Sequence, residues 1–185
     1  MEVYKGKKEA YLTQLNNINK KYNRISLFRL LTIVLFLVSI YYYIQTNEST
    51  YAFLAAVLFG LFIILMRLHS KLSFQRKISN ALIEINENEI AYLERKKISF
   101  ENGVEFNDFH HPYAYDLDIF GDHSLFQNLN RTATFIGKKT LAKQLLTLLP
   151  NEEILRNHEA LKELSEQLDW RQEFLTSAKL GRDTK

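Results

Sequence analysis

The feature that most constrains this chain is a pair of apolar runs separated by a short polar break. The runs cover residues 30–47 and 49–66, and each has 18 residues without a charged side chain. A helix needs roughly 17–25 such residues to cross the ~30 Å hydrocarbon core of a bilayer. Because backbone groups in lipid must be satisfied within their own segment, each run is expected to be an α-helix. The pair therefore predicts a transmembrane helical hairpin, with its turn at residues 45–50.

The charges beside the runs predict how the hairpin is oriented. Lysine and arginine gather on both outer flanks, and the turn has neither; the flanking cations are Lys20, Lys21, Arg24, Arg29, Arg67, Lys71, Arg76 and Lys77. Positive charge is retained on the cytoplasmic side of a membrane, so both termini are expected in the cytoplasm. Tyr41, Tyr42, Tyr43 and Tyr51 bracket the turn, as is typical of aromatic residues at the headgroup level.

Two other interpretations of the apolar runs are open. A cleaved signal peptide is disfavoured because the charged lead-in is too long and no small-residue cleavage site follows the first run. A buried hairpin in a soluble protein would need a large covering surface, which the remaining chain scarcely supplies. The sequence Asn47-Glu48-Ser49 matches a glycosylation acceptor, but it would lie too close to the bilayer to act as one.

The composition favours an all-α fold. Two prolines and six glycines leave little room for a many-turned β architecture. The absence of cysteine excludes disulfides, thiolate metal sites and a cysteine nucleophile. A net charge of +3 is too small to argue for nucleic-acid binding by itself.

The pattern along the chain predicts four segments. These are a basic amphipathic segment (1–29), the transmembrane hairpin (30–66), a polar connecting helix (67–97) and a cytoplasmic helical domain with a short β-prone loop segment (98–185). Apolar side chains at helical steps place the first segment on the membrane surface as a short helix. The connecting helix is either a continuation of the second membrane helix or a packed helix of the cytoplasmic domain.

Local signals divide the last segment further. Asn102-Gly103 is a turn signal between two β-prone pieces, residues 97–100 and 104–106. Ser124 is a plausible N-cap for the next helix, and a leucine-lined helix over residues 137–149 is expected to stop at Pro150. Asn151 is expected to cap a final helix that runs to about Ala178, with Gly181 marking its end.

Two clusters invite a chemical interpretation, and neither has the spacing that the chemistry needs. The histidines and aspartates of residues 110–123 include no histidine pair with the helical i, i+4 geometry of a zinc motif, and they lack the oxygen spacing of a calcium loop. Gly137-Lys138-Lys139-Thr140 lacks the earlier glycine of a phosphate-binding loop, since Thr132 occupies that place. We therefore predict no catalytic, cofactor-binding or metal-binding residues, and no enzymatic activity for this chain.

Residues 106–180 carry a family resemblance. The stretch from His111 to Gly121, followed by residues 124–137, resembles the start of the core (lever) domain of MutS-family proteins. The motif positions are Ser124, Leu125, Asn130, Thr132, Thr134, Gly137, Leu149 and Pro150, and the next helix is matched by residues 154–156, 160–164 and 171–174. With the hairpin in front, the chain most resembles a membrane-anchored, bacterial MutS-like branch, which implies the inner (cytoplasmic) membrane.

The resemblance implies a parent protein whose C-terminal domain binds ATP and Mg²⁺, dimerises and couples ATP to DNA binding in mismatch repair. This chain departs from the family pattern in two respects. It has no phosphate-binding loop, and it has no Phe-x-Glu wedge of the mismatch-reading domain. The ATPase and the homodimer contacts would then lie in sequence beyond residue 185, and this chain would be an N-terminal fragment.

Two functions follow as hypotheses. In the first, the membrane-anchored MutS-like fragment contacts duplex DNA weakly, through the phosphate backbone. The candidate cations are Arg131, Lys138, Lys139 and Lys143, whose alternative role is a solvated helix face. In the second, the chain is a membrane-anchored helical adaptor that binds a protein partner and has no DNA role. A membrane enzyme that uses the His/Asp loop is a distant third.

Overall fold

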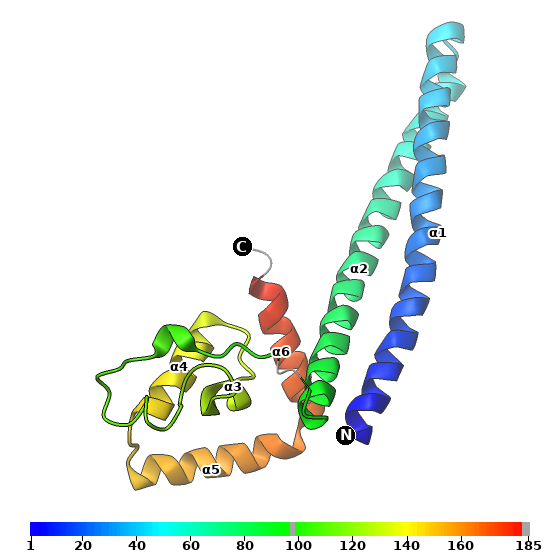
Figure 1. The fold of residues 1–185 in the computed structure, drawn as a ribbon. Helices are drawn as coiled ribbons and strands as arrows, with labels where there is room; N and C mark the ends of the chain where they lie inside the picture. The colour runs from blue at the N-terminus through cyan, green and yellow to red at the C-terminus, as the bar shows by residue number, and fades with distance from the viewer. Residues whose placement is uncertain (97–98, 183–185) are drawn as a thin grey trace. The chain divides into compact units, whose positions relative to one another are not determined.

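All regular structure in the described chain is helical. The computed structural model describes residues 1–96 and 99–182 (Figure 1). The helices are α1 (Glu2–Thr46), α2 (Ser49–Leu93), the 3₁₀ helix η1 (Val104–Phe106), α3 (Leu125–Leu129), α4 (Phe135–Leu146), α5 (Asn151–Glu166) and α6 (Leu168–Arg182). No strand occurs within these described ranges, which confirms the all-α prediction.

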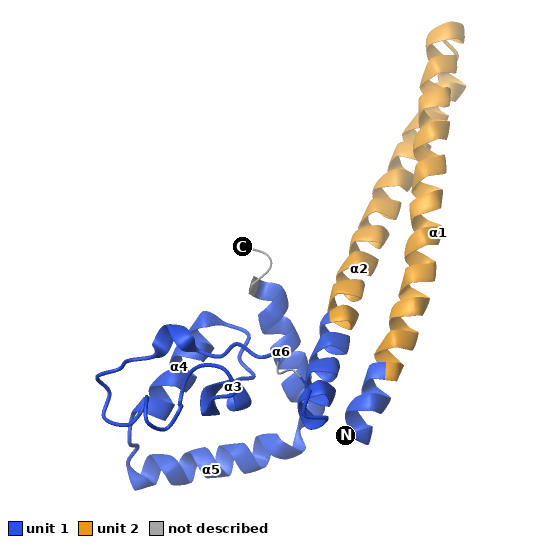
Figure 2. Cartoon of the chain, in the orientation of Figure 1, with its two compact units in different colours: residues 1–8, 81–185 blue, residues 9–80 orange. Residues whose placement is uncertain are grey.

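The chain forms two compact units, shown in different colours in Figure 2. Unit 1 comprises Met1–Lys8 and Ala81–Lys185, and unit 2 comprises Glu9–Asn80. Helices α1 and α2 each contribute residues to both units. The amphipathic segment predicted for residues 1–29 is therefore divided between the units: residues 1–8 belong to unit 1, and residues 9–29 belong to unit 2.

Unit 2 is made from α1 after its first turns, the turn at residues 47 and 48, and α2 as far as Asn80. The predicted polar break shortens to residues 47 and 48, where Asn47 takes a left-handed conformation (φ 54°) that ends α1. Next to this turn, the Ser39 hydroxyl donates to the Tyr51 carbonyl across the pair at 3.2 Å. Phe36 and Phe59 meet further along the pair, with ring centroids 5.8 Å apart. These contacts confirm the helical hairpin.

The two helices are longer than the apolar runs. Helix α1 continues without a break from residue 2 through the apolar run, so residues 1–29 are not a separate short helix. The reason is that no proline interrupts the helical repeat where polar residues give way to apolar ones. Helix α2 extends past the apolar run to Leu93, so residues 67–93 continue the second apolar helix, and those from Ala81 onward also pack within unit 1.

Ion pairs join the first turns of α1 to the rest of unit 1. The pairs are Lys5–Glu94 (3.7 Å), Lys8–Glu87 (2.9 Å) and Lys7–Asp169. The first two acids are on α2 or just after it, and the third is on α6. The basic N-terminus is therefore partly neutralised within unit 1.

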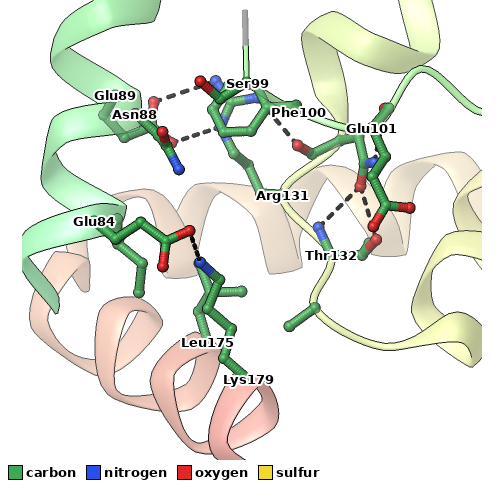
Figure 3. A pocket seen from close by; sticks show the side chains of 13 residues that line it. Glu84, Asn88, Glu89, Ser99, Phe100, Glu101, Arg131, Thr132, Leu175 and Lys179 are labelled. Atoms are coloured by element: carbon green, nitrogen blue, oxygen red, sulfur yellow. Dashed lines mark hydrogen bonds and ion pairs between the residues drawn. The ribbon is translucent and has the colours of Figure 1, made fainter. Parts of the chain in front are cut away.

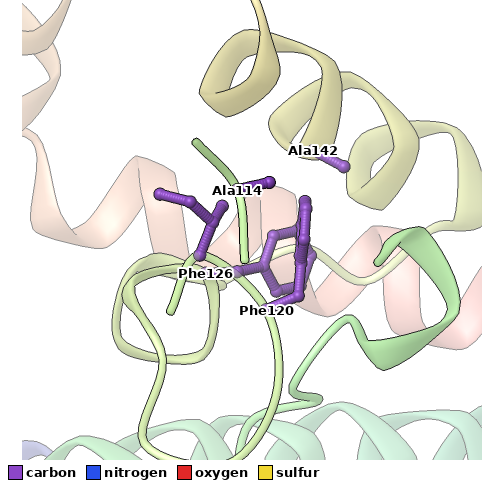
Figure 4. Packing of buried hydrophobic residues seen from close by; sticks show 5 residues of the cluster. Ala114, Phe120, Phe126 and Ala142 are labelled. Carbon is purple, nitrogen blue, oxygen red and sulfur yellow. The ribbon is translucent and has the colours of Figure 1, made fainter. Parts of the chain in front are cut away.

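An aromatic cluster forms the core of the rest of unit 1 (Figure 4). Phe126 is fully buried, and its ring centroid lies 5.4 Å from Phe120 and 5.9 Å from Phe106. Ala114, Ile119 and Ala142 complete the buried cluster. Phe106 reaches it from η1, so residues 104–106 form a 3₁₀ turn and not the predicted β-prone piece. Of the other predicted piece, residues 97 and 98 lie outside the described residues.

The helix ends of unit 1 confirm one predicted cap and correct three other boundaries. The Ser124 hydroxyl accepts from the Gln127 N–H, as predicted for an N-cap. Helix α4 is capped by Thr134 and begins at Phe135, two residues before the predicted start, and it ends at Leu146. Asn151 is the first residue of α5 and not its cap, since Pro150 occupies that position.

The predicted helix from Asn151 to about Ala178 is in fact two helices. Gln167 leaves the helical conformation (φ −100°, ψ 58°) and separates α5 from α6. The apolar repeat continues across this point, so nothing local indicates the break. The break lets α6 bury Gln172 and Thr176, which are 3% and 4% exposed.

Candidate functional site

Unit 2 has an extensive exposed apolar surface. Only 11% of the most apolar 18-residue window of α1 and 6% of that of α2 is buried. A core helix of a soluble domain would bury most of such a window, whereas here the side chains face outward. The exposed side chains include Leu27, Phe28, Leu30, Leu31, Val34, Leu35 and Leu37 on α1 and Phe53, Leu54, Val57, Phe59, Ile63 and Ile64 on α2. Both helices are long and apolar enough to span a membrane.

A basic and aromatic cluster lies at the polar end of unit 2. The ring of Tyr22 on α1 lies 4.2 Å from that of His69 on α2, and the Arg76 guanidinium lies 4.4 Å from the centre of the Tyr22 ring. Burial lowers the pKa of His69 below its ordinary value, and the positive charges of Arg29 and Arg76 lower it further. The His69 imidazole is therefore harder to protonate than a free imidazole, because its surroundings are already positive.

Arg131, a predicted DNA contact, forms an ion pair and cation–π contacts within unit 1. Its Nε and Nη2 atoms donate to the two Glu89 carboxylate oxygens at 2.5 and 3.2 Å. The guanidinium also lies 3.6 Å from the centre of the Phe100 ring and 4.7 Å from that of Tyr92. This two-point ion pair joins the segment between α3 and α4 to α2. Arg131 is thus a structural residue in this state of the protein.

The three predicted lysines differ in their surroundings. Lys138 forms ion pairs with Glu101 and, at 3.3 Å, with Glu105. The hydrogen bond that Lys138 donates to Glu101 is the main cause of its raised pKa, and Glu105 adds to the effect against the opposing influence of burial. Lys139 and Lys143 are exposed on α4 and form no ion pair among the described residues. They are the two predicted cations that remain open to a phosphate backbone.

The Arg131–Glu89 pair borders a small cavity, seen in Figure 3. The cavity has a volume of about 170 Å³ and lies between the end of α2, the chain around Phe100 and α6. Lys179 on α6 pairs with Glu84 on α2 at 2.7 Å at its edge. Each charged side chain named here is paired with an opposite charge. The cavity therefore lies in a polar packing interface between α2, the chain around Phe100 and α6.

Unit 1 also has a larger apolar groove, which has a volume of about 430 Å³ and is lined in part by Arg131. Trp170 and Phe174 on α6 stack along it with ring centroids 5.3 Å apart, and they are 49% and 64% exposed. Trp170, the lone tryptophan of the chain, therefore lines an open groove. The signal that reveals this groove is the i, i+4 spacing of the two aromatic residues on an otherwise polar helix.

The histidine and aspartate loop is not gathered around one point. The His111 ring lies 3.1 Å from the Leu146 carbonyl, and the His110 backbone N–H donates to Asp108. In residues 1–96 and 99–182 no group of three or more histidines and acids is placed to hold a metal ion. Gly137 lies in the first turn of α4, where its N–H donates to the Thr134 hydroxyl.

Four of the residues that carry the MutS resemblance, Asn130, Thr132, Thr134 and Gly137, are connected in the link between α3 and α4. The Asn130 side-chain oxygen accepts from the Thr132 N–H at 3.0 Å and from the Thr132 hydroxyl at 2.7 Å. Thr134 then caps α4, and a Cβ on Gly137 would come within 3.3 Å of Thr132 and 3.1 Å of Thr134. Each position therefore has a structural role in linking α3 to α4.

No protein-family model, characterised protein or solved structure matches the chain. The resemblance therefore rests on the sequence motifs alone.

Proposed function

We propose that this chain anchors a helical cytoplasmic domain to the inner membrane of a bacterium. The observation that carries the proposal is the outward-facing apolar surface of α1 and α2 in unit 2. At roughly 25 cal/mol per Å², apolar side chains on two such helices favour a hydrocarbon environment over water. In this multi-pass arrangement the hairpin spans the bilayer and both termini remain in the cytoplasm.

The distribution of charge supports this orientation. Unit 2 has eight lysines and arginines, all on the flanks away from the Asn47 turn. Its two acids are Glu9 and Glu48, and Glu48 lies in that turn. Retention of the basic flanks in the cytoplasm places Glu48 on the opposite side of the membrane.

Single cysteines test the orientation directly, because the chain has none of its own. A membrane-impermeant maleimide added to intact spheroplasts should label Glu48→Cys. The matched variant Ser165→Cys, exposed on α5, should react only after lysis. The reverse pattern would contradict the orientation. Recovery of the wild-type chain in the soluble fraction would contradict the anchor itself.

We further propose that residues 98–185 begin the core domain of a MutS-related protein that binds DNA in an ATP-dependent way. The support is the motif series from Ser124 to Pro150, in which polar side chains and Gly137 form the α3–α4 link. In the resembled family ATP, Mg²⁺ and the homodimer contacts belong to a C-terminal domain, and residues 1–185 contain no phosphate-binding loop of such a domain. The chain by itself is then not an enzyme.

The mass of the native protein tests the MutS proposal. An antibody raised against residues 151–166, which form the exposed helix α5, should detect a membrane protein several times heavier than this chain. A native band at the mass of this chain would leave no room for an ATPase and would contradict the proposal.

The second candidate is a membrane-anchored adaptor that binds a protein partner and not DNA. The observation that favours it is the apolar groove beside Trp170 and Phe174. Exposed aromatic side chains in a concave surface are typical of protein interfaces. Binding of the chain to duplex DNA with a steep salt dependence would favour the first candidate, and salt-insensitive, partner-dependent recovery from the membrane would favour the adaptor.

A further inference from the structure

A groove runs between α1 and α2 inside unit 2, with a volume of about 770 Å³. One end is polar and is lined by Asn23, Ser26 and Arg29 of α1. The other end is apolar and is lined by Ile33 of α1 with Phe62 and Met66 of α2. The groove therefore changes from polar to apolar along the direction in which α1 enters the proposed membrane.

The groove extends from the headgroup level of the anchored chain into the start of the hydrocarbon core. Asn23 and Ile33 are ten residues apart on one helix, which corresponds to ~15 Å at a rise of 1.5 Å per residue. Of this length ~9 Å, from Asn23 to Arg29, precedes the charge-free run, and ~6 Å, from Arg29 to Ile33, lies along the start of the hydrocarbon core. Arg29 directly precedes the charge-free run, which places its guanidinium at headgroup level in the anchored chain.

The charge of unit 2 selects an anionic headgroup. Among the described residues Arg29 forms no ion pair, and both acids of unit 2 lie outside the groove lining. Arg29 also contributes to the positive surroundings of His69. A guanidinium at this depth lacks a counter-charge from the protein, and a lipid phosphate supplies one with two matching oxygens. Basic pockets between membrane helices on the cytoplasmic side bind anionic headgroups in this way.

We propose that the groove binds one anionic phospholipid of the cytoplasmic leaflet. Arg29 pairs with the headgroup phosphate, and the Asn23 amide and the Ser26 hydroxyl donate hydrogen bonds to the headgroup oxygens. An acyl chain lies along Ile33, Phe62 and Met66. This proposal rests on the anchored, cytoplasmic-terminus orientation described above.

The test is native mass spectrometry of the full chain in detergent with equal amounts of phosphatidylglycerol and phosphatidylcholine. The wild-type chain should retain phosphatidylglycerol preferentially. Arg29→Gln should lower its retention about fivefold, as expected for loss of one interfacial cation. The matched control Arg67→Gln, a flanking cation outside the groove lining, should leave it unchanged. Equal retention of the two lipids, or an equal loss in both variants, would overturn the proposal.

Two further measurements distinguish a lipid-binding groove from nonspecific lipid association and from a site for soluble phosphate. Ser26→Trp fills the polar end without changing the charge and should displace both lipids, so continued lipid retention would contradict a bound site. Excess inorganic phosphate should leave the lipid in place, whereas its displacement would indicate a site for soluble phosphate. The membrane fractionation of each variant is measured separately. A wild-type chain that selects phosphatidylglycerol in detergent but fails to fractionate with membranes would refute the anchor and not the groove.

Discussion

Asn86 on α2 and Gln172 on α6 form a reciprocal pair of amide hydrogen bonds in the interior of unit 1. The Gln172 Nε2 donates to the Asn86 Oδ1 at 2.9 Å, and the Asn86 Nδ2 donates to the Gln172 Oε1 at 3.4 Å. Asn86 is fully buried and Gln172 is 3% exposed. Because buried amides are costly when unpaired, this pair specifies where α6 lies on α2.

The first prediction concerns this amide pair. Gln172→Ala should lower the free energy of unfolding by about 1–3 kcal/mol, because it leaves the Asn86 amide partly unsatisfied. The measurement is urea unfolding of the full chain in detergent, followed by the fluorescence of Trp170, the only tryptophan, two residues away on α6. The double variant Asn86→Leu/Gln172→Leu should recover most of the loss. A double variant less stable than Gln172→Ala would show that the two amides stabilise unit 1 by more than their mutual hydrogen bonds.

The second prediction concerns Gly103, which has a left-handed backbone (φ 69°). A Cβ at this position would lie 2.6 Å from Phe126 Cδ1 and 3.0 Å from Phe120 Cδ1, inside the aromatic core. Gly103→Ala should therefore destabilise unit 1 by roughly 1–3 kcal/mol through overpacking, with about 1 kcal/mol more from the backbone conformation.

Gly121→Ala is the matched control for this substitution. Gly121 also has a positive φ (111°), but a Cβ there would meet nothing within 4 Å. Its variant isolates the backbone cost from the overpacking, and the same Trp170 fluorescence reports both. Equal losses in the two variants would show that the packing of Phe126 against residue 103 contributes nothing.

The sequence predicts the parts of this fold that depend on local chemistry. The hairpin follows from two 18-residue charge-free runs and from the need of a helix to satisfy its own backbone. The cap at Ser124 follows from the side chain's ability to accept from an N–H three residues later. Both features are decided by residues close together in the chain.

The parts that escaped prediction depend on distant partners. Arg131 and Lys138 have the sequence pattern of open cations, but their acids lie 42 and 37 residues away, at Glu89 and Glu101. The break at Gln167 is equally invisible, because the apolar repeat runs through it and the gain comes from burying Gln172 against α2. Sequence periodicity alone carries no information about either contact.

The third prediction concerns His69, whose pKa is lowered chiefly by burial and then by Arg29 and Arg76. The unfolded chain binds this proton more readily than the folded chain does. The contribution of neutral His69 to the free energy of unfolding is therefore fully present above the ordinary pKa of about 6.5, and it is lost as the pH drops below that value. Arg76→Gln should raise the His69 pKa. The imidazole ¹⁵N shifts measure it directly, with His69→Gln identifying the signal among the five histidines. An unchanged or lower value in Arg76→Gln would refute the electrostatic contribution.

The fourth prediction separates the four candidate DNA contacts. Lys139 and Lys143 are exposed and unpaired among the described residues, so the double variant Lys139→Gln/Lys143→Gln should reduce the slope of log binding constant against log salt by about 2. Arg131→Gln should act differently. It leaves the Glu89 carboxylate, which is 18% exposed, without its cation, and so should lower the stability of unit 1 by about 1–3 kcal/mol.

The two effects are measured on the same samples, by fluorescence anisotropy of a labelled duplex across a salt series and by Trp170-detected unfolding. A changed salt slope in Arg131→Gln, at salt and temperature where unit 1 stays folded, would mean that DNA displaces Glu89 from the guanidinium. An unchanged slope in the double lysine variant would exclude α4 as a DNA-binding surface and would favour the adaptor function.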